Sequence, residues 1–326
     1  MRDKIIRWES FLLLLCVGVF VFGTTTDGFA DTDNIGFLLL DYSEVALLAF
    51  ALLPIVLTGE IDLSVASTLG FCSALTGTLW DAGLPFETIL PVVLLAGAVL
   101  GALNAVLVVK FGLPSLAVTI GTLGLYRGLA YIVLGDGAVT GFPSAYRPLA
   151  TDYAPLIVLA VGVIIAVGVH FTTLGRSLFA IGLGAETARF SGIRVEKIKM
   201  LLFVVSGLLA ALASLIYTLR YNSARADNAN GLELAAVAAV LLGGVSIFGG
   251  RGTVFGVAAA LLLMAGLRNV LFLNDVSNEI QNVITGLLLI VSVLVPVAAR
   301  ALARRRPVPA APVVLKEEEV RWPVHD

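Results

Sequence analysis

Long apolar runs separated by short polar segments make up most of the chain. Runs of about 20 residues with few charges are typical of helices that cross a lipid bilayer. We identify ten such runs, at residues 11–23, 45–57, 63–80, 88–109, 114–134, 155–171, 200–219, 234–248, 254–273 and 280–299. Several are short for a bilayer core of ~30 Å, so one or two are expected to be broken or re-entrant. The pattern predicts an all-α polytopic membrane protein with about ten transmembrane helices.

The composition supports this fold class. The 326 residues are 59% hydrophobic and only 13% charged, whereas soluble domains carry about a quarter charged residues. A net charge of −2 gives no general attraction to nucleic acid. The two histidines and two cysteines cannot assemble a metal site, and both cysteines lie in apolar runs as small hydrophobic residues.

The distribution of cations predicts the topology. Ten spans place both termini on one side of the membrane, and that side then holds 16 of the 21 lysines and arginines. The opposite side holds three, and two fall within spans. Under the positive-inside rule, this asymmetry favours ten spans with both termini in the cytoplasm. The basic head and first apolar run also fit a cleaved signal peptide, but a signal anchor explains the same pattern.

No linker divides the apolar part of the chain, so residues 1–306 are interpreted as one transmembrane domain. Residues 307–326 contain proline and mixed charge without periodicity. This composition predicts a disordered cytoplasmic tail.

One polar segment, residues 180–200, stands out between the apolar runs. Ala185, Ala188 and Gly192 recur at helical spacing, which predicts a short helix from about Ala185 with a small-residue face. Gly192 followed by Ile193 is typical of a helix stop, with glycine in the left-handed conformation and isoleucine packing back on the helix. Two interpretations of these residues remain open. The segment is either a short exposed helix whose small-residue face docks onto a partner, or an ordinary basic cytoplasmic loop.

Polar side chains within the apolar runs are functional candidates, because burying them in a membrane is costly. Asparagine at such positions also forms hydrogen bonds that hold neighbouring helices together. The candidates are Asn104, Thr119, Thr122, Arg268, Asn269, Gln281 and Asn282.

Residues 59–64 place two carboxylates, Glu60 and Asp62, at a junction between apolar runs. Asp62 together with Ser64 could cap the helix that follows. The alternative is direct contact with a substrate or with a moving part of a partner.

The glycine-rich segment 243–253 is not a nucleotide-binding loop. Such a loop requires glycine followed by Gly-Lys-Ser/Thr, and no lysine of this chain follows a glycine. Gly249, Gly250, Arg251 and Gly252 are instead expected to form a tight cytoplasmic turn between two closely packed spans. No zinc-protease motif, nucleophile elbow or paired-carboxylate pattern indicates an enzyme.

Four segments, taken together, resemble the permeases of bacterial ABC importers for ribose, xylose, rhamnose and autoinducer 2. They are GEIDLSVAS (59–67), LPSLAVTIGTLGLYRGLAYIVLGDG (113–137), AIGLGAETARFSGI (180–193) and LLGGVSIFGGRGTVFG (241–256). Within that group, GEIDLSVA, IVLGDGAVTGFP (132–143) and EIQNVITGLLLIVSVLVP (279–296) look most like rhamnose permeases.

The resemblance implies a permease subunit of an ATP-driven importer for a monosaccharide such as rhamnose. It implies three protein partners: a cytoplasmic ATPase that uses ATP and Mg, an extracytoplasmic sugar-binding protein, and a second permease that is identical or a sister subunit. This chain itself is expected to bind no cofactor and no metal. The resemblance also makes residues 180–199 a coupling segment that docks into a groove of the ATPase, through Ala185, Glu186, Ala188, Arg189 and Gly192.

The solute path is expected at polar positions within spans, because sugar hydroxyls need few strong ligands when a binding protein supplies selectivity. The candidates for this path are Asn104, Thr119, Thr122 and Asn269. A second hypothesis is a secondary carrier or channel that works alone, although no span carries a carboxylate suited to ion coupling. A third is a membrane receptor or scaffold, which would carry no flux.

Overall fold

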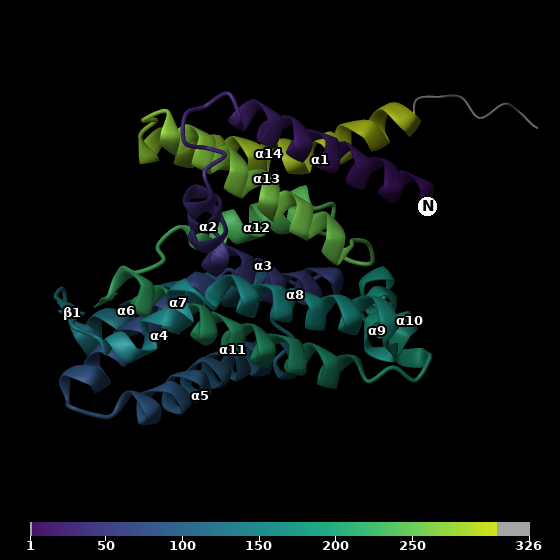
Figure 1. The fold of residues 1–326 in the computed structure, drawn as a ribbon. Coiled ribbons are helices and arrows are strands. Elements are labelled where there is room, and N and C mark those ends of the chain that lie inside the picture. The colour runs from purple at the N-terminus through teal and green to yellow at the C-terminus, as the bar shows by residue number, and fades with distance from the viewer. Residues whose placement is uncertain (1, 305–326) are drawn as a thin grey trace, which may run out of the picture.

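A computed structural model of the chain describes residues 2–304. Nearly all of the regular structure is α-helical (Figure 1). The helices are α1 (Arg2–Gly23), α2 (Thr32–Asp41), α3 (Ser43–Leu57), α4 (Val65–Asp81), α5 (Phe86–Ala105), α6 (Ser115–Leu134), α7 (Arg147–Thr151), α8 (Ala154–Phe171), α9 (Thr173–Leu183), α10 (Ala185–Phe190), α11 (Val195–Tyr221), α12 (Leu232–Leu242), α13 (Val254–Leu273) and α14 (Asn278–Arg304). A π-helical turn, Val106–Lys110, extends α5, and a 3-10 turn, Ser144–Tyr146, precedes α7.

The all-α polytopic prediction is confirmed, since a helix lies within or over each of the ten predicted runs. Five described helices are long and apolar enough to cross a membrane, or six if α2 and α3, bent by 42° at their junction, form one span. Residues 8–23 of α1, together with α9 and α12, are shorter apolar helices. The total of about ten spans and the cytoplasmic side of the termini stay predictions. The predicted disordered tail, 307–326, lies outside the described residues.

Helix α3 is the centre of the fold. All fifteen of its residues are buried, and it packs against α11, α12 and α8. Figure 1 shows it between a lower group of helices that includes α5, α8 and α11 and an upper group that includes α1, α13 and α14. A helix that is apolar on every side can be buried in this way without exposing polar groups.

Helices α5 and α11 pack extensively against each other and meet at glycines. A Cβ on Gly97 would overlap the carbonyl oxygen of Gly207, and a Cβ on Gly101 would overlap that of Phe203. Small residues at such crossings let two backbones approach, which is the main source of helix association in lipid. The glycines of this pair therefore have a packing role.

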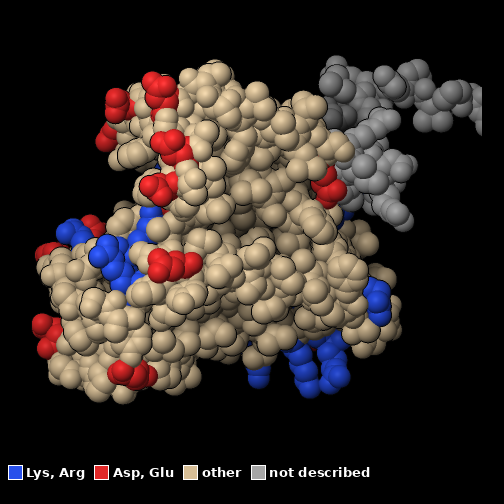
Figure 2. Space-filling view, in the orientation of Figure 1, with Lys and Arg blue, Asp and Glu red and all other residues tan. Residues whose placement is uncertain are grey.

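The two ends of the molecule differ. Figure 1 places the N-terminus together with α9 and α10 at one end, and strand β1 at the other. There β1 (Ala138–Thr140) pairs antiparallel with β2 (Ser223–Arg225). At the end of β2, the Arg225 guanidinium donates to the Asp227 carboxylate at 2.8 Å and lowers the pKa of that carboxyl group. In Figure 2, one group of Lys and Arg side chains lies at the lower right, and a second group lies at the left, where most of the visible Asp and Glu side chains also lie.

Candidate functional site

The backbone leaves helical structure between α3 and α4, and this break is the centre of a polar network. The Ile61 N–H donates to Ser115 Oγ at 3.1 Å, and its carbonyl oxygen accepts from Thr119 Oγ1 at 3.3 Å. Both hydroxyls lie on α6. Irregular backbone at membrane depth needs protein partners, because lipid offers none. Helix α6 therefore replaces hydrogen bonds that the break has lost.

Asp62 is buried inside this break, with 2% of its surface exposed. Its Oδ1 accepts from the Ser64 N–H at 3.0 Å and from Ser64 Oγ at 2.6 Å, while Oδ2 accepts from Ser206 Oγ on α11 at 3.0 Å. Ser64 is the N-cap residue of α4 but makes no capping hydrogen bond. Its hydroxyl instead donates to Asp62 and accepts from Asn104 Nδ2. The pair of Asp62 and Ser64 ties the break to α11.

Asn104 extends the network to α5 and α6. Its Nδ2 donates to Ser64 Oγ at 2.8 Å, and its Oδ1 accepts from the Tyr126 hydroxyl at 3.1 Å. Asn104, Thr119 and Thr122 are all nearly fully buried. Three of the four residues expected along a solute path thus lie close to the break. Asn104 joins α5 to the break and to α6, and Thr119 joins α6 to the break, whereas Thr122 donates to the Thr119 carbonyl oxygen of its own helix at 3.4 Å. Their contact with solute stays a prediction.

The break also contacts the predicted coupling segment directly. Lys199, near the start of α11, forms a salt bridge with Glu60, and both side chains are about one-sixth exposed. Gly182 on α9 packs against the end of α3 so closely that a Cβ would overlap the Leu57 carbonyl oxygen. The same oxygen accepts from the Gly250 N–H at 2.9 Å. A movement of α9 or of the start of α11 therefore reaches the break through two separate contacts.

The glycine-rich turn between α12 and α13 lies against the same place. Gly249 and Gly250 have φ values of 78° and 71°, a conformation that favours glycine. The Ser246 N–H donates to the Arg251 carbonyl oxygen at 2.9 Å, and Gly252 also has a positive φ. The predicted tight turn is confirmed.

Helix α10 ends as the sequence predicts. The Ile193 N–H donates to the Ala188 carbonyl oxygen and the Gly192 N–H to that of Arg189, with Gly192 at φ 83°. These two bonds form a Schellman motif. Ile193 packs back on a small cluster that includes Ala188 and Val195.

The outward face of α10 differs from the prediction. Ala188 is 3% exposed and belongs to the molecule's own apolar cluster, so it is not part of an outward small-residue face. The side chains of Glu186, Arg189 and Phe190 are exposed instead, Phe190 by 90%. Arg189 also forms a salt bridge with Glu196 at the start of α11.

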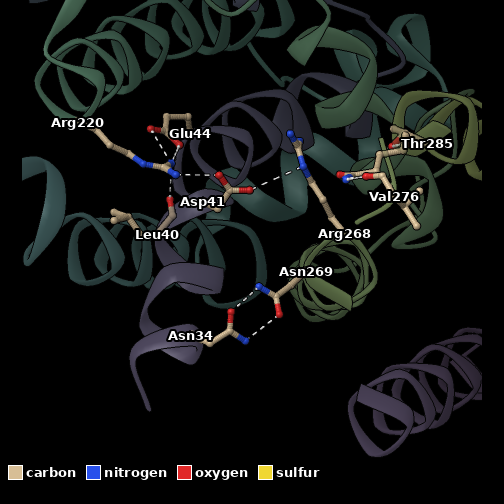
Figure 3. A network of polar contacts seen from close by, with 10 residues as sticks. Asn34, Leu40, Asp41, Glu44, Arg220, Arg268, Asn269, Val276 and Thr285 are labelled. Atoms are coloured by element: carbon tan, nitrogen blue, oxygen red, sulfur yellow. Dashed lines mark hydrogen bonds and ion pairs between the residues drawn. The ribbon is translucent and has the colours of Figure 1, made fainter. Parts of the chain in front are cut away.

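Asn269, the fourth residue expected along the path, lies elsewhere, on α13. Its amide exchanges two hydrogen bonds of 2.9 Å with the Asn34 amide of α2 (Figure 3). Nearby, Arg220 of α11 donates to Asp41 at 2.8 Å and to Glu44 at 3.1 Å. The described residues contain no group of three or more His, Cys, Asp or Glu side chains that could hold a metal ion.

Sequence reasoning missed the partners that complete the network, chiefly Ser206, Ser115 and Tyr126. A hydroxyl within an apolar run carries little signal, since serine and threonine also bond to their own helix. Lys199 was counted as a cation, but its pairing with Glu60, 139 residues away, could not be seen.

Comparison with known proteins identifies relatives along most of the chain. A family described as "Branched-chain amino acid transport system / permease component" matches residues 34–293. The autoinducer 2 import system permease protein LsrD of Photorhabdus luminescens is 31% identical over 300 residues, covering 88% of this chain and 90% of that protein. LsrD of Yersinia enterocolitica is 32% identical, with 88% and 91% covered. No solved structure matches the chain.

Proposed function

The chain belongs to the family of branched-chain amino acid transport system permease components, and from this premise we propose that it is the membrane subunit of an ATP-driven importer for a monosaccharide or a related small hydroxylated solute. It is a multi-pass inner-membrane protein and a permease subunit, so the ATPase is a separate chain. The single observation that carries the proposed mechanism is the contact between the α9–α11 segment and the break after α3.

The proposed mechanism starts at α10. When ATP, with Mg, closes the partner ATPase subunits, they push on the exposed residues of α10. The resulting movement of α9 displaces the end of α3 through the close contact at Gly182. The movement of the start of α11 displaces the break through the Lys199–Glu60 salt bridge. The break is suited to change shape because side-chain hydroxyls, rather than a helix ladder, satisfy its backbone. The spans then alternate between outward-open and inward-open states.

The proposed partners are those of ABC importers in general: the ATPase, an extracytoplasmic solute-binding protein and a second permease, identical or a sister. Two substrates are tested first. Rhamnose is proposed from the resemblance of residues 59–66, 132–143 and 279–296 to rhamnose permeases. Autoinducer 2 is proposed because the relatives LsrD are named as its import permeases.

The test is uptake by proteoliposomes that contain the chain with its ATPase and binding protein. We expect uptake of labelled L-rhamnose or autoinducer 2 only when ATP is supplied on the ATPase side. Uptake by the chain alone, driven by an ion gradient, would refute the proposal in favour of a stand-alone carrier. Absence of flux under every condition would favour a receptor or scaffold.

The coupling step is tested separately in the same vesicles. Replacing Glu186 by alanine or Gly192 by valine should abolish uptake and solute-stimulated ATPase activity, because the first removes an exposed contact and the second cannot easily hold φ 83°. Ser177→Ala on α9, an exposed hydroxyl bonded to its own helix at 3.0 Å, is the control and should keep full activity. Full activity in both test variants would refute docking through α10.

A further inference from the structure

A cavity of about 160 Å³ lies between α2, α13 and α14, apart from the network around the break. Its volume is below the roughly 300–1,000 Å³ of pockets that hold drug-sized ligands, so it suits a small solute. Its wall combines polar groups with two aromatic rings. The residues that matter are Asp41, Arg268, Asn269, Gln281, Phe37 and Phe272.

The carboxylate of the cavity is held in place from outside it. Arg220 is 8% exposed and donates to Asp41 Oδ1 at 2.8 Å, as well as to the Leu40 carbonyl oxygen at 3.0 Å (Figure 3). The second oxygen, Asp41 Oδ2, lies 3.8 Å from Arg268 Nε. That separation is too long for a hydrogen bond and leaves room for a bridging hydroxyl.

Arg268 has donors to spare. Its Nε lies 3.8 Å from Asp41 Oδ2, beyond hydrogen-bond distance, and 42% of its side chain is exposed. A guanidinium presents five N–H donors in a fixed fork. A hydroxylated ligand can therefore accept from Arg268 while donating to Asp41.

The two amides of the wall are oriented in advance. Two reciprocal hydrogen bonds with the Asn34 amide hold the Asn269 amide in place. The Gln281 Nε2 donates to the Val276 carbonyl oxygen at 2.9 Å. Each amide has more donor and acceptor positions than these contacts use. In the same wall, the rings of Phe37 and Phe272 lie with centroids 6.0 Å apart and offer an apolar surface for C–H groups.

The charges around the cavity point to a neutral ligand. The charged side chains of its wall are Asp41 and Arg268, one of each sign, so the wall leaves no net charge for an ionic ligand to neutralise. Adjacent donors and acceptors beside an aromatic wall match a molecule with several hydroxyls and an apolar face.

We propose that this cavity is a binding subsite for a neutral, polyhydroxylated solute of monosaccharide size, with one solute hydroxyl bridging Asp41 and Arg268. The inference rests on the proposed function, because it names where the transported solute is held within a single permease chain. Asn269 and Gln281 orient the solute, and Phe272 packs on its C–H face.

The test is equilibrium binding to the full-length chain assembled with its partner subunits in lipid nanodiscs. Labelled L-rhamnose, D-ribose and autoinducer 2 are the probes. Arg268→Gln should weaken binding of the probe that binds best by about tenfold or more, since hydrogen bonds to a charged group are among the strongest in proteins. Arg225→Gln is the matched control: it removes an arginine that pairs with an aspartate outside the cavity, and should leave binding unchanged.

A second measurement covers the case in which Arg268→Gln fails to fold. Asn278, an exposed residue on the cavity wall, is replaced by cysteine, and its reaction with a maleimide is timed with and without the same probe at saturation. The parent chain, with Cys16 partly and Cys72 fully buried, gives the background. Protection of the new cysteine by the probe supports the subsite.

The outcomes separate the subsite from the proposed function. Protection and binding loss without any ATP-driven uptake would support the subsite and refute the importer. ATP-driven uptake together with unchanged binding in Arg268→Gln and no protection at position 278 would overturn the subsite and keep the importer. Binding of none of the three probes would overturn the subsite as proposed.

Discussion

Asp62 shows how much a single buried side chain holds together. Its two oxygens accept three hydrogen bonds, from the Ser64 N–H, the Ser64 hydroxyl and the Ser206 hydroxyl. Asp62→Ala leaves all three donors buried without their acceptor, and each unsatisfied buried group costs about 1–3 kcal/mol. We expect a clear fall in the unfolding temperature of the detergent-solubilised protein.

A control for this prediction is Thr76→Ala, at a fully buried hydroxyl that donates only to the Cys72 carbonyl oxygen of its own helix at 2.8 Å. Its effect should be much smaller, since the helix ladder stays intact. An equal fall in both variants would contradict the role given to Asp62.

The salt bridge between Lys199 and Glu60 gives a second prediction. Either Lys199→Glu or Glu60→Lys alone places two like charges together in a partly buried position, and should reduce solute-stimulated ATPase activity severalfold. The double exchange restores opposite charges and should recover most of the activity. A double variant as impaired as the singles would show that the pair does not carry the coupling.

At the scale of the single residue, the sequence identifies many residues of the network but not the contacts that they make. Asp62, Ser64, Asn104 and Thr119 stand out because they are polar within or beside apolar runs, and all four meet at the break. Their partner Ser206 is an ordinary serine in an apolar run, 144 residues from Asp62. Only the fold brings such residues together.

At the scale of the element, helix crossings are sensitive to single methyl groups. Gly97→Val should destabilise the protein by about 1–3 kcal/mol, because its side chain would overlap α11 and must displace a backbone. Gly121→Ala on α6 is the matched control, since nothing lies within 4 Å of the added Cβ. The two variants are compared by thermal unfolding in the same detergent. Equal stabilities would contradict the close α5–α11 contact.

The elements themselves follow well from the pattern of the sequence, because apolar runs in lipid form helices almost by necessity. Each of the ten runs contains a helix, although α12 ends at Leu242, before the end of the run 234–248, and the small helix at Ala185 with its glycine stop is confirmed. The direction in which α10 faces was mispredicted for Ala188. A small-residue stripe fits a partner's groove and the molecule's own core equally well, and here α9 and α11 supply the core.

At the scale of the whole molecule, the proposed topology gives a prediction about the two ends. A cysteine replacing Ser191, exposed beside α10, should react with a membrane-impermeant maleimide only after the cytoplasmic side is opened. A cysteine replacing Asn230, exposed before α12 and predicted to lie on the other side, should react in intact cells. The reverse pattern would invert the topology and remove the basis for coupling to a cytoplasmic ATPase.

The enclosure of α3 has a consequence for how the protein is made. Helix α3 is synthesised early, yet α8, α11 and α12, which surround it, emerge from the ribosome far later. Its Glu44 meets Arg220 only after 176 further residues have been added. Until then, the nascent chain must hold this carboxyl group without its counter-ion. Ribosome stalling or truncation before residue 220 should therefore leave an orphan segment that membrane quality control can recognise.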